Sequence, residues 1–196
     1  MHEGNDDWVE QAILDAHTRG KFKAHLKLLV CDNPDAHVLK MAIKEKIKAF
    51  IADRRDCLSK EGFEEQIIKK LKSEKIDLIV LAGFMRILSP RFIRHYRNKI
   101  LNVHPALLPA FKGAHAIKDA FSYGVKVTGV TVHFVDEEMD HGPIILQEAV
   151  EVRENDTLEA LEKRIHTAEH TIYPRAIKLF LGNKLRISKR TVRAEK

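Results

Sequence analysis

The chain has little cysteine, few aromatic residues and no long apolar run. Its two cysteines, Cys31 and Cys57, are too few for a disulfide framework and lack the spacing of metal ligands. No apolar stretch is long enough to cross a bilayer, and the start of the sequence lacks the charged and then apolar pattern of a signal peptide. We therefore expect reduced thiols, a cytoplasmic location and no membrane contact.

Basic residues exceed acidic ones, giving a formal net charge of +6, but they are dispersed along the chain. The exception is a basic tail at roughly residues 186–196, which we expect to be a solvated and partly frayed end. Zinc-finger and RNA-binding aromatic signatures are missing, so we expect no nucleic-acid partner. An excess of positive charge also suits anionic small substrates.

Short apolar runs alternate with segments of helical periodicity through the first two thirds of the chain. Runs of strand length begin at Leu26, Ile47, Ile76 and Lys99, and the helical segments span residues 8–17, 35–45 and 60–74. This βαβ rhythm predicts a doubly wound, mostly parallel sheet. A hydrophobic fraction of 44% is enough for one ordinary core, so we expect a single domain over residues 1–196.

The last third of the chain departs from that rhythm. Two β-branched runs, residues 125–135 and 143–152, are joined by an acidic loop and predict an antiparallel strand pair appended to the sheet. A long amphipathic helix is expected from about Thr157 to Phe180, behind the N-cap candidates Asn155 and Asp156. The predicted fold class is therefore α/β, with a mostly parallel sheet, an antiparallel pair and a long C-terminal helix.

Two polar residues, Asn102 and His104, end an apolar run immediately before Pro105. In a strand, alternate side chains face the same way, so these two side chains would share one face. Pro105 cannot donate a backbone hydrogen bond, which makes a continued ladder unfavourable. The pair should therefore lie at the carboxyl edge of the sheet, where open α/β sheets bind their ligands.

Asp140, in the acidic loop before Gly142 and Pro143, is a candidate third member of this set. An amide and an imidazolium can both donate hydrogen bonds to an oxyanion, and a nearby carboxylate favours the charged imidazole. The combination suits acyl-group chemistry, with direct attack by a substrate amine because no serine or cysteine in these motifs offers a nucleophile. Spacing alone leaves the alternative that Asn102 caps a strand end, His104 is an interior histidine and Asp140 is a turn acid.

Four ordered motifs carry a resemblance to a known family. They are L-A-G-F-M-R-I-L-S-P at Leu81, N-V-H-P-A-L-L-P-A-F-K-G at Asn102, the segment from Gly124 to Gln147, and E-H-T-I-Y-P at Glu169. From about Ala12 to Leu185 the chain strongly resembles the folate-dependent phosphoribosylglycinamide formyltransferases. The resemblance implies transfer of a formyl group from 10-formyltetrahydrofolate to the amine of glycinamide ribonucleotide, in de novo purine synthesis.

The resemblance also implies roles for individual residues. Asn102 and His104 would stabilise the oxyanion, while Asp140 would hold His104 and, through water, help move the amine proton to the departing folate nitrogen. Glu169 would contact the ribonucleotide. The folate pocket would be formed by Lys60, Met85, Arg86, Ile87, Leu88 and the loop from Val135 to Asp140.

Several of these residues also fit plainer roles. The apolar residues of M-R-I-L could belong to a core, and Lys60 could be solvated at a helix start. Glu169 could be an exposed acid in its helix, and His133 could be a packed histidine in its strand. The histidines form no compact ligand set such as H-E-x-x-H, so we predict no metal.

The N-terminal segment departs from the family, which opens with a buried strand and a loop like S-G-x-G-S-N that holds the substrate phosphate through backbone N–H groups. Here the first strand is missing. Gly4 and Asn5 resemble a remnant of the loop and would contact the ribonucleotide, but Asp6 and Asp7 would repel a phosphate. Loss of a central strand should expose the edges of its neighbours. A truncated sequence, a strand from a partner chain or loss of ribonucleotide transfer would each explain this, and the intact downstream motifs favour truncation.

Related activities predict different domain organisations. A 10-formyltetrahydrofolate hydrolase shares the Asn, His and Asp set but usually carries an N-terminal regulatory domain. Methionyl-tRNA formyltransferase adds a C-terminal RNA-binding domain, and we expect neither domain here. The hydrolase chemistry and a folate-binding module without ribonucleotide transfer stay as alternatives, and the chain could be a monomer or a homodimer.

Overall fold

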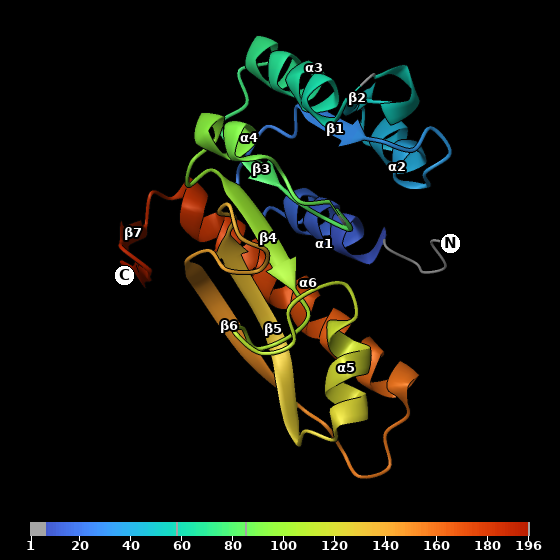
Figure 1. Ribbon diagram of the computed structural model, residues 1–196, viewed down its shortest axis with the longest axis vertical. Helices are drawn as coiled ribbons and strands as arrows, with labels where there is room; N and C mark the ends of the chain where they lie inside the picture. The colour runs from blue at the N-terminus through green and yellow to red at the C-terminus, as the bar shows by residue number, and fades with distance from the viewer. Residues whose placement is uncertain (1–6, 58, 85, 196) are drawn as a thin grey trace.

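The computed structural model describes residues 7–57, 59–84 and 86–195, and our expectations for Gly4, Asn5 and Met85 lie outside them. The helices are α1 (Asp7–Thr18), α2 (Val38–Lys44), α3 (Lys60–Ser73), α4 (Pro90–His95), α5 (Ala116–Tyr123) and α6 (Leu158–Leu181). The strands are β1 (Leu28–Cys31), β2 (Lys48–Ile51), β3 (Ile79–Val80), β4 (Ile100–His104), β5 (Val127–Phe134), β6 (Ile144–Glu151), β7 (Leu185–Ser188) and β8 (Thr191–Ala194). The predicted α/β class and the long C-terminal helix are confirmed (Figure 1).

Six strands form one sheet in the order β3-β4-β5-β6-β8-β7, and β1 and β2 form a separate parallel pair. β3 and β4 are parallel, whereas β5 lies antiparallel to both β4 and β6, as the two β-branched runs predicted. Within the β4–β5 ladder, Asn102 lies opposite His133 and His104 lies opposite Thr131. This register brings polar side chains of two strands to one end of the sheet.

The sheet is interrupted between β1 and β3, which do not pair with each other in the described part of the chain (Figure 1). All residues of β1 and both residues of β3 are half-buried, whereas Ile100 and Leu101 of β4 are inaccessible to solvent. Strands that are covered on both faces and both edges are normally buried throughout. β1 and β3 are therefore less covered than β4.

α6 supplies much of the core against the six-stranded sheet (Figure 1). Leu161, Ile165 and Ile172 recur at helical spacing on its buried face. The Tyr173 hydroxyl lies 2.7 Å from the carbonyl oxygen of Leu81 and 2.9 Å from that of Leu101, and burial raises its pKa well above the usual value. These bonds fix α6 against the strand that carries Asn102 and His104. Among the described helices, none is long and apolar enough to cross a membrane.

The predicted N-cap of α6 is wrong. The cap is Thr157, whose hydroxyl accepts a hydrogen bond from the Ala160 N–H at 3.2 Å, rather than Asn155 or Asp156. Asp156 instead forms an ion pair with Arg164, about two turns into the helix. The carboxylate is thus drawn away from the helix end by a tertiary partner, which leaves the threonine to cap it.

The prediction of a frayed basic tail is also wrong. β7 and β8 form an antiparallel hairpin, and Thr191 of β8 pairs with Ile144 of β6. The apolar residues of the hairpin, Leu185, Ile187 and Val192, alternate with polar ones and pack on the core. These apolar side chains attach to the core a segment whose charge alone suggested a solvated end.

Candidate active site

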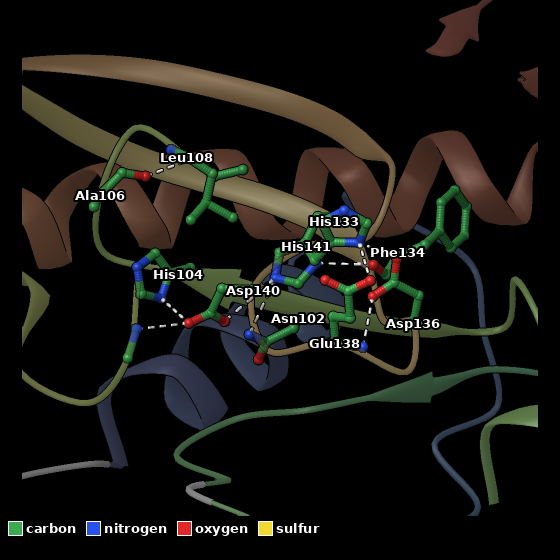
Figure 2. Close-up of polar contacts among 12 residues, drawn as sticks. Asn102, His104, Ala106, Leu108, His133, Phe134, Asp136, Glu138, Asp140 and His141 are labelled. Atoms are coloured by element: carbon green, nitrogen blue, oxygen red, sulfur yellow. Dashed lines mark hydrogen bonds and ion pairs between the residues drawn. The ribbon is translucent and has the colours of Figure 1, made fainter. Parts of the chain in front are cut away.

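His104 ends β4 and is buried, with 4% of its surface exposed. Its Nε2 lies 2.8 Å from the Phe111 carbonyl oxygen, so this nitrogen carries a proton and donates. Its Nδ1 faces Asp140 Oδ2 at 3.4 Å (Figure 2). Both ring nitrogens therefore face acceptor oxygens, and only the ring that is protonated on both nitrogens donates to both.

Asp140 belongs to the loop between β5 and β6 and turns its carboxylate toward β4 (Figure 2). Its Oδ2 accepts a hydrogen bond from the Gly113 N–H at 2.8 Å, and its Oδ1 lies 3.8 Å from His133 Nε2. The φ angle of Asp140 is 48°, in the left-handed region that residues with a Cβ occupy only with support from their surroundings. The structure thus brings Asp140 to His104 and holds it there from two loops.

Asn102 is oriented by His133 on the neighbouring strand (Figure 2). His133 Nδ1 donates to the Phe134 carbonyl oxygen at 2.8 Å, which leaves Nε2 to accept from the Asn102 amide at 3.4 Å. Burial lowers the pKa of the His133 ring, against the opposing effects of the Phe134 carbonyl and Asp140. The neutral ring therefore uses one amide hydrogen of Asn102 and leaves the other for a ligand.

His133 is a site residue whose role the sequence did not reveal. It is packed, as expected, with 2% of its surface exposed. Its contact with Asn102 depends on the antiparallel register of β4 and β5. The available signal was a polar residue amid β-branched ones in T-V-H-F-V, but the sequence does not give the register that places it opposite Asn102.

The loop that carries Asp140 is closed at its base. Phe134 N–H donates to the Pro143 carbonyl at 2.9 Å, and Val135 N–H donates to the Ile100 carbonyl at 3.0 Å. A Cβ on Gly142 would lie 1.8 Å from the Phe134 carbonyl oxygen, so only glycine allows the two sides of the loop to come this close. The glycine before Pro143 is therefore a requirement of the loop that presents Asp140.

A cavity of about 160 Å³ lies between α3 and the segment that follows β3. Of the described residues predicted to form the folate pocket, Lys60, Arg86, Ile87 and Leu88 line it, whereas Val135 and Asp140 do not. The cavity adds Arg54, which sequence reasoning missed because no motif connects the 3-10 helix at Arg54–Asp56 with the later segment. Its remaining walls are Phe63, Glu64, Ile67 and Phe84. Three cationic side chains thus line an otherwise mainly apolar hollow.

The pocket residues differ in burial. Leu88 is 6% exposed and belongs to the core while it also lines the cavity, whereas Ile87 is 57% exposed and is not a core residue. Arg86 forms an ion pair with Asp32 at 2.8 Å. Lys60 is exposed at the first turn of α3, behind the N-cap Ser59. Exposed Ile87 and Lys60 leave the cavity open to a ligand.

Glu169 is buried, which rules out the plainer reading of an exposed acid on α6. Its Oε2 lies 2.8 Å from His166 Nδ1, one turn earlier in the helix. Trp8 of α1 stacks on the His166 ring with the ring centroids 6.2 Å apart and the planes at 2°. His166 is therefore the hydrogen-bonding partner of Glu169, Trp8 stacks on His166, and neither contact was predicted.

Metal ligation has no candidate among the described residues, where no group of three or more His, Cys, Asp or Glu side chains could hold an ion. Cys31 and Cys57 are free thiols. The chemistry that the described residues offer is therefore that of hydrogen-bond donors, a carboxylate and cationic side chains.

Comparisons with known proteins assign the chain to a family. The sequence model of the formyl transferase family matches residues 3–177. The phosphoribosylglycinamide formyltransferase of Bacillus subtilis (strain 168) is 46% identical over 172 residues, which cover 88% of this chain and 88% of that protein. The crystal structure of glycinamide ribonucleotide transformylase 1 from Symbiobacterium toebii is similar with a TM-score of 0.94 and 41% identity, covering 97% of this chain and 90% of that one.

A related activity is also found among the solved structures. A formyltetrahydrofolate deformylase from Pseudomonas syringae pv. tomato has a TM-score of 0.90 at 25% identity, covering 97% of this chain and 63% of that one. The chain belongs to the formyl transferase family and is a transferase by its relatives. The resemblance to phosphoribosylglycinamide formyltransferases that its motifs carry is confirmed.

Proposed function

We propose that this protein transfers a formyl group from 10-formyltetrahydrofolate to the amine of glycinamide ribonucleotide, a step of purine biosynthesis. The observation that carries the proposal is that Asn102, His104 and Asp140 converge at the end of β4. The loop between β5 and β6 brings Asp140 to His104. The names of the relatives from Bacillus subtilis and Symbiobacterium toebii support the same substrate.

The amine nitrogen attacks the formyl carbon, and the carbonyl oxygen becomes an oxyanion. One hydrogen of the Asn102 amide is used by His133, so the second donates to this oxygen. His104 Nε2 donates to the Phe111 carbonyl at 2.8 Å, whereas Nδ1 lies a longer 3.4 Å from Asp140, so we assign to Nδ1 a hydrogen bond that Asp140 and the oxyanion share. Donors of this kind contribute on the order of 10² to 10³ in rate each.

Proton transfer completes the reaction. The attacking amine becomes cationic and must lose a proton, while the departing folate nitrogen must gain one. Asp140 is the nearest carboxylate to His104, and its 3.4 Å separation from Nδ1 is longer than a strong charge-assisted hydrogen bond. We assign Asp140 the positioning of His104 and, through water, the relay of the proton from amine to folate.

We assign the folate to the cavity between α3 and the segment that follows β3. Ile87 and Leu88 supply apolar walls, and the loop from Val135 to Asp140 covers the pterin with its backbone groups. The cations of Lys60, Arg86 and Arg54 line the cavity and suit the carboxylates of the folate glutamate. Glu169 contacts the ribonucleotide. Both partners are then small molecules, and the reaction takes place in the cytoplasm.

Hydrolysis of 10-formyltetrahydrofolate is the second candidate, because the deformylase from Pseudomonas syringae shares the fold. In that reaction water replaces the amine as nucleophile and the same oxyanion donors serve. The two activities differ in their dependence on glycinamide ribonucleotide, so the assay itself separates them.

The test is release of tetrahydrofolate from 10-formyltetrahydrofolate, followed spectrophotometrically with and without glycinamide ribonucleotide. We expect release that requires the ribonucleotide and a formylated amine as the second product. Release that is equally fast without ribonucleotide would establish the hydrolase instead. Folate binding without either reaction would leave a binding module, and the proposed transfer would be wrong.

A further inference from the structure

The turn of the C-terminal hairpin contacts the loop that carries Asp140. Arg190, between β7 and β8, donates from Nη2 to the carbonyl oxygen of His141 at 2.6 Å. Its Nη1 lies 2.7 Å from His141 Nε2. A segment that the sequence suggested to be a solvated tail is thus bonded to the residue that directly follows Asp140.

The hydrogen bonds continue from His141 into the rest of the loop. Arginine can only donate, so His141 Nε2 is the acceptor and Nδ1 carries the proton. His141 Nδ1 lies 2.8 Å from Asp136 Oδ2, and Asp136 Oδ1 accepts from the Glu138 N–H at 3.1 Å (Figure 2). Hydrogen bonds therefore run from the Arg190 guanidinium through the His141 ring to Asp136 at the first turn of the loop, and Arg190 Nη1 also lies 3.2 Å from His141 Nδ1.

The loop has little other support at its outer side. Its base is closed by the backbone bonds of Phe134 and Val135, and Asp140 is held by Gly113. Between these points Met139 is 51% exposed, and Glu137 and Glu138 are exposed as well. Ordering of an exposed loop costs conformational entropy. Contacts that fix the loop before substrate binds reduce the cost that binding would otherwise carry.

We propose that Arg190 is a positioning residue for Asp140. Arg190 holds His141 from the hairpin. Through His141 and Asp136 it orders the loop in the conformation in which Asp140 points toward His104. Its effect on turnover rests on the proposed formyl transfer, whereas its effect on the order of the loop does not. The hairpin is then a functional part of the active site that touches no substrate.

Amide hydrogen exchange of the free protein tests the clamp without any substrate. The variants are Arg190→Ala, Arg190→Lys and, as the matched control, Arg193→Ala, which removes an exposed arginine on β8 of the same hairpin. We expect Arg190→Ala to speed exchange several-fold in a peptide that covers residues 135–143, with Arg190→Lys in between and Arg193→Ala unchanged. Equal exchange in Arg190→Ala and Arg193→Ala would overturn the proposal.

Steady-state kinetics of the same variants test whether the clamp affects the reaction in which Asp140 takes part. Arg190→Ala should lower kcat about tenfold and raise the KM for the folate, with partial rescue in Arg190→Lys. Because Arg190 and His141 act in one line of bonds, the double variant Arg190→Ala with His141→Ala should be no slower than the slower single variant. Full additivity would contradict the clamp. Faster exchange in a protein that transfers no formyl group would support the clamp and refute the proposed function alone.

Discussion

The six-stranded sheet and the separate β1–β2 pair, called here the continuous half and the looser half, differ in how deeply their strands are buried. β4 and β5 are covered on both faces, and Leu101, Val130 and Val132 are inaccessible to solvent. β1 and β2 form their own ladder, in which β1 is half-buried and β2 is largely exposed. The proposed oxyanion donors, Asn102 and His104, come from the continuous half, while Arg54 and Lys60 of the cavity come from segments that follow β2. The residues proposed for the chemistry therefore lie on the more deeply buried strands, whereas two of the three cations of the cavity follow the more exposed strand pair.

The largest effect should come from the catalytic pair in the continuous half. Asn102→Ala removes one oxyanion donor and should lower kcat about 10² to 10³-fold, which corresponds to about 3 to 4 kcal/mol of barrier. Folate affinity should change little because the bond forms mainly in the transition state. Measured kcat and folate Kd check this, and near-normal turnover would show that Asn102 does not stabilise the oxyanion.

Substitution of one leucine in each half compares how much each half contributes to the free energy of unfolding. Leu101→Ala in β4 removes an inaccessible side chain and should reduce the free energy of unfolding by about 3 to 5 kcal/mol. Leu28→Ala in β1 removes a half-buried one and should cost about 1 to 2 kcal/mol. Urea unfolding of both variants gives the two values. Equal losses would mean that the halves are packed alike despite the interruption of the sheet.

His133 makes the continuous half sensitive to acid. Its folded pKa is lowered by burial, while the unfolded chain takes up the proton below about 6.5. The unfolded state therefore binds more protons as pH falls, and the free energy of unfolding should decrease below about pH 6.5 until the folded pKa is passed. His133→Gln should flatten this dependence, whereas His25→Gln, at an exposed position, should keep it. If the free energy of unfolding depended on pH equally in wild type and His133→Gln, another group would be responsible for the acid sensitivity.

The smallest effect should come from the pocket rim in the looser half. Arg54→Ala removes one of three cations from the cavity and should raise the KM for the folate a few-fold with kcat unchanged, since Arg54 lines the cavity and not the reacting group. Surface charges contribute modestly to binding because water and salt screen them. Lys44→Ala on α2 serves as a control for the loss of net charge. A fall in kcat would place Arg54 closer to the reaction than the cavity suggests.

Local patterns in the sequence predicted more of the site residues than of the residues that hold them in place. The spacing of Asn102 and His104 before Pro105 predicted two side chains at a strand end, and the four motifs predicted the family. The prediction of the strand end succeeds because the direction of a side chain in a strand depends only on its position among a few neighbouring residues. By contrast, the tail was misjudged from its charge, although its alternating Leu185, Ile187 and Val192 already carried a strand pattern.

What only the tertiary structure decided concerns partners far apart in the chain. The register of β4 against β5 places His133 beside Asn102, and the fold brings Arg54 to the same cavity as Arg86. The hairpin turn brings Arg190 to His141, 49 positions away in sequence. Each of these contacts depends on how strands and loops are packed rather than on local preference. The sequence by itself determined which groups could perform the chemistry, and packing decided which other residues hold them in place, because contacts between distant segments are set by the global minimum of the whole chain.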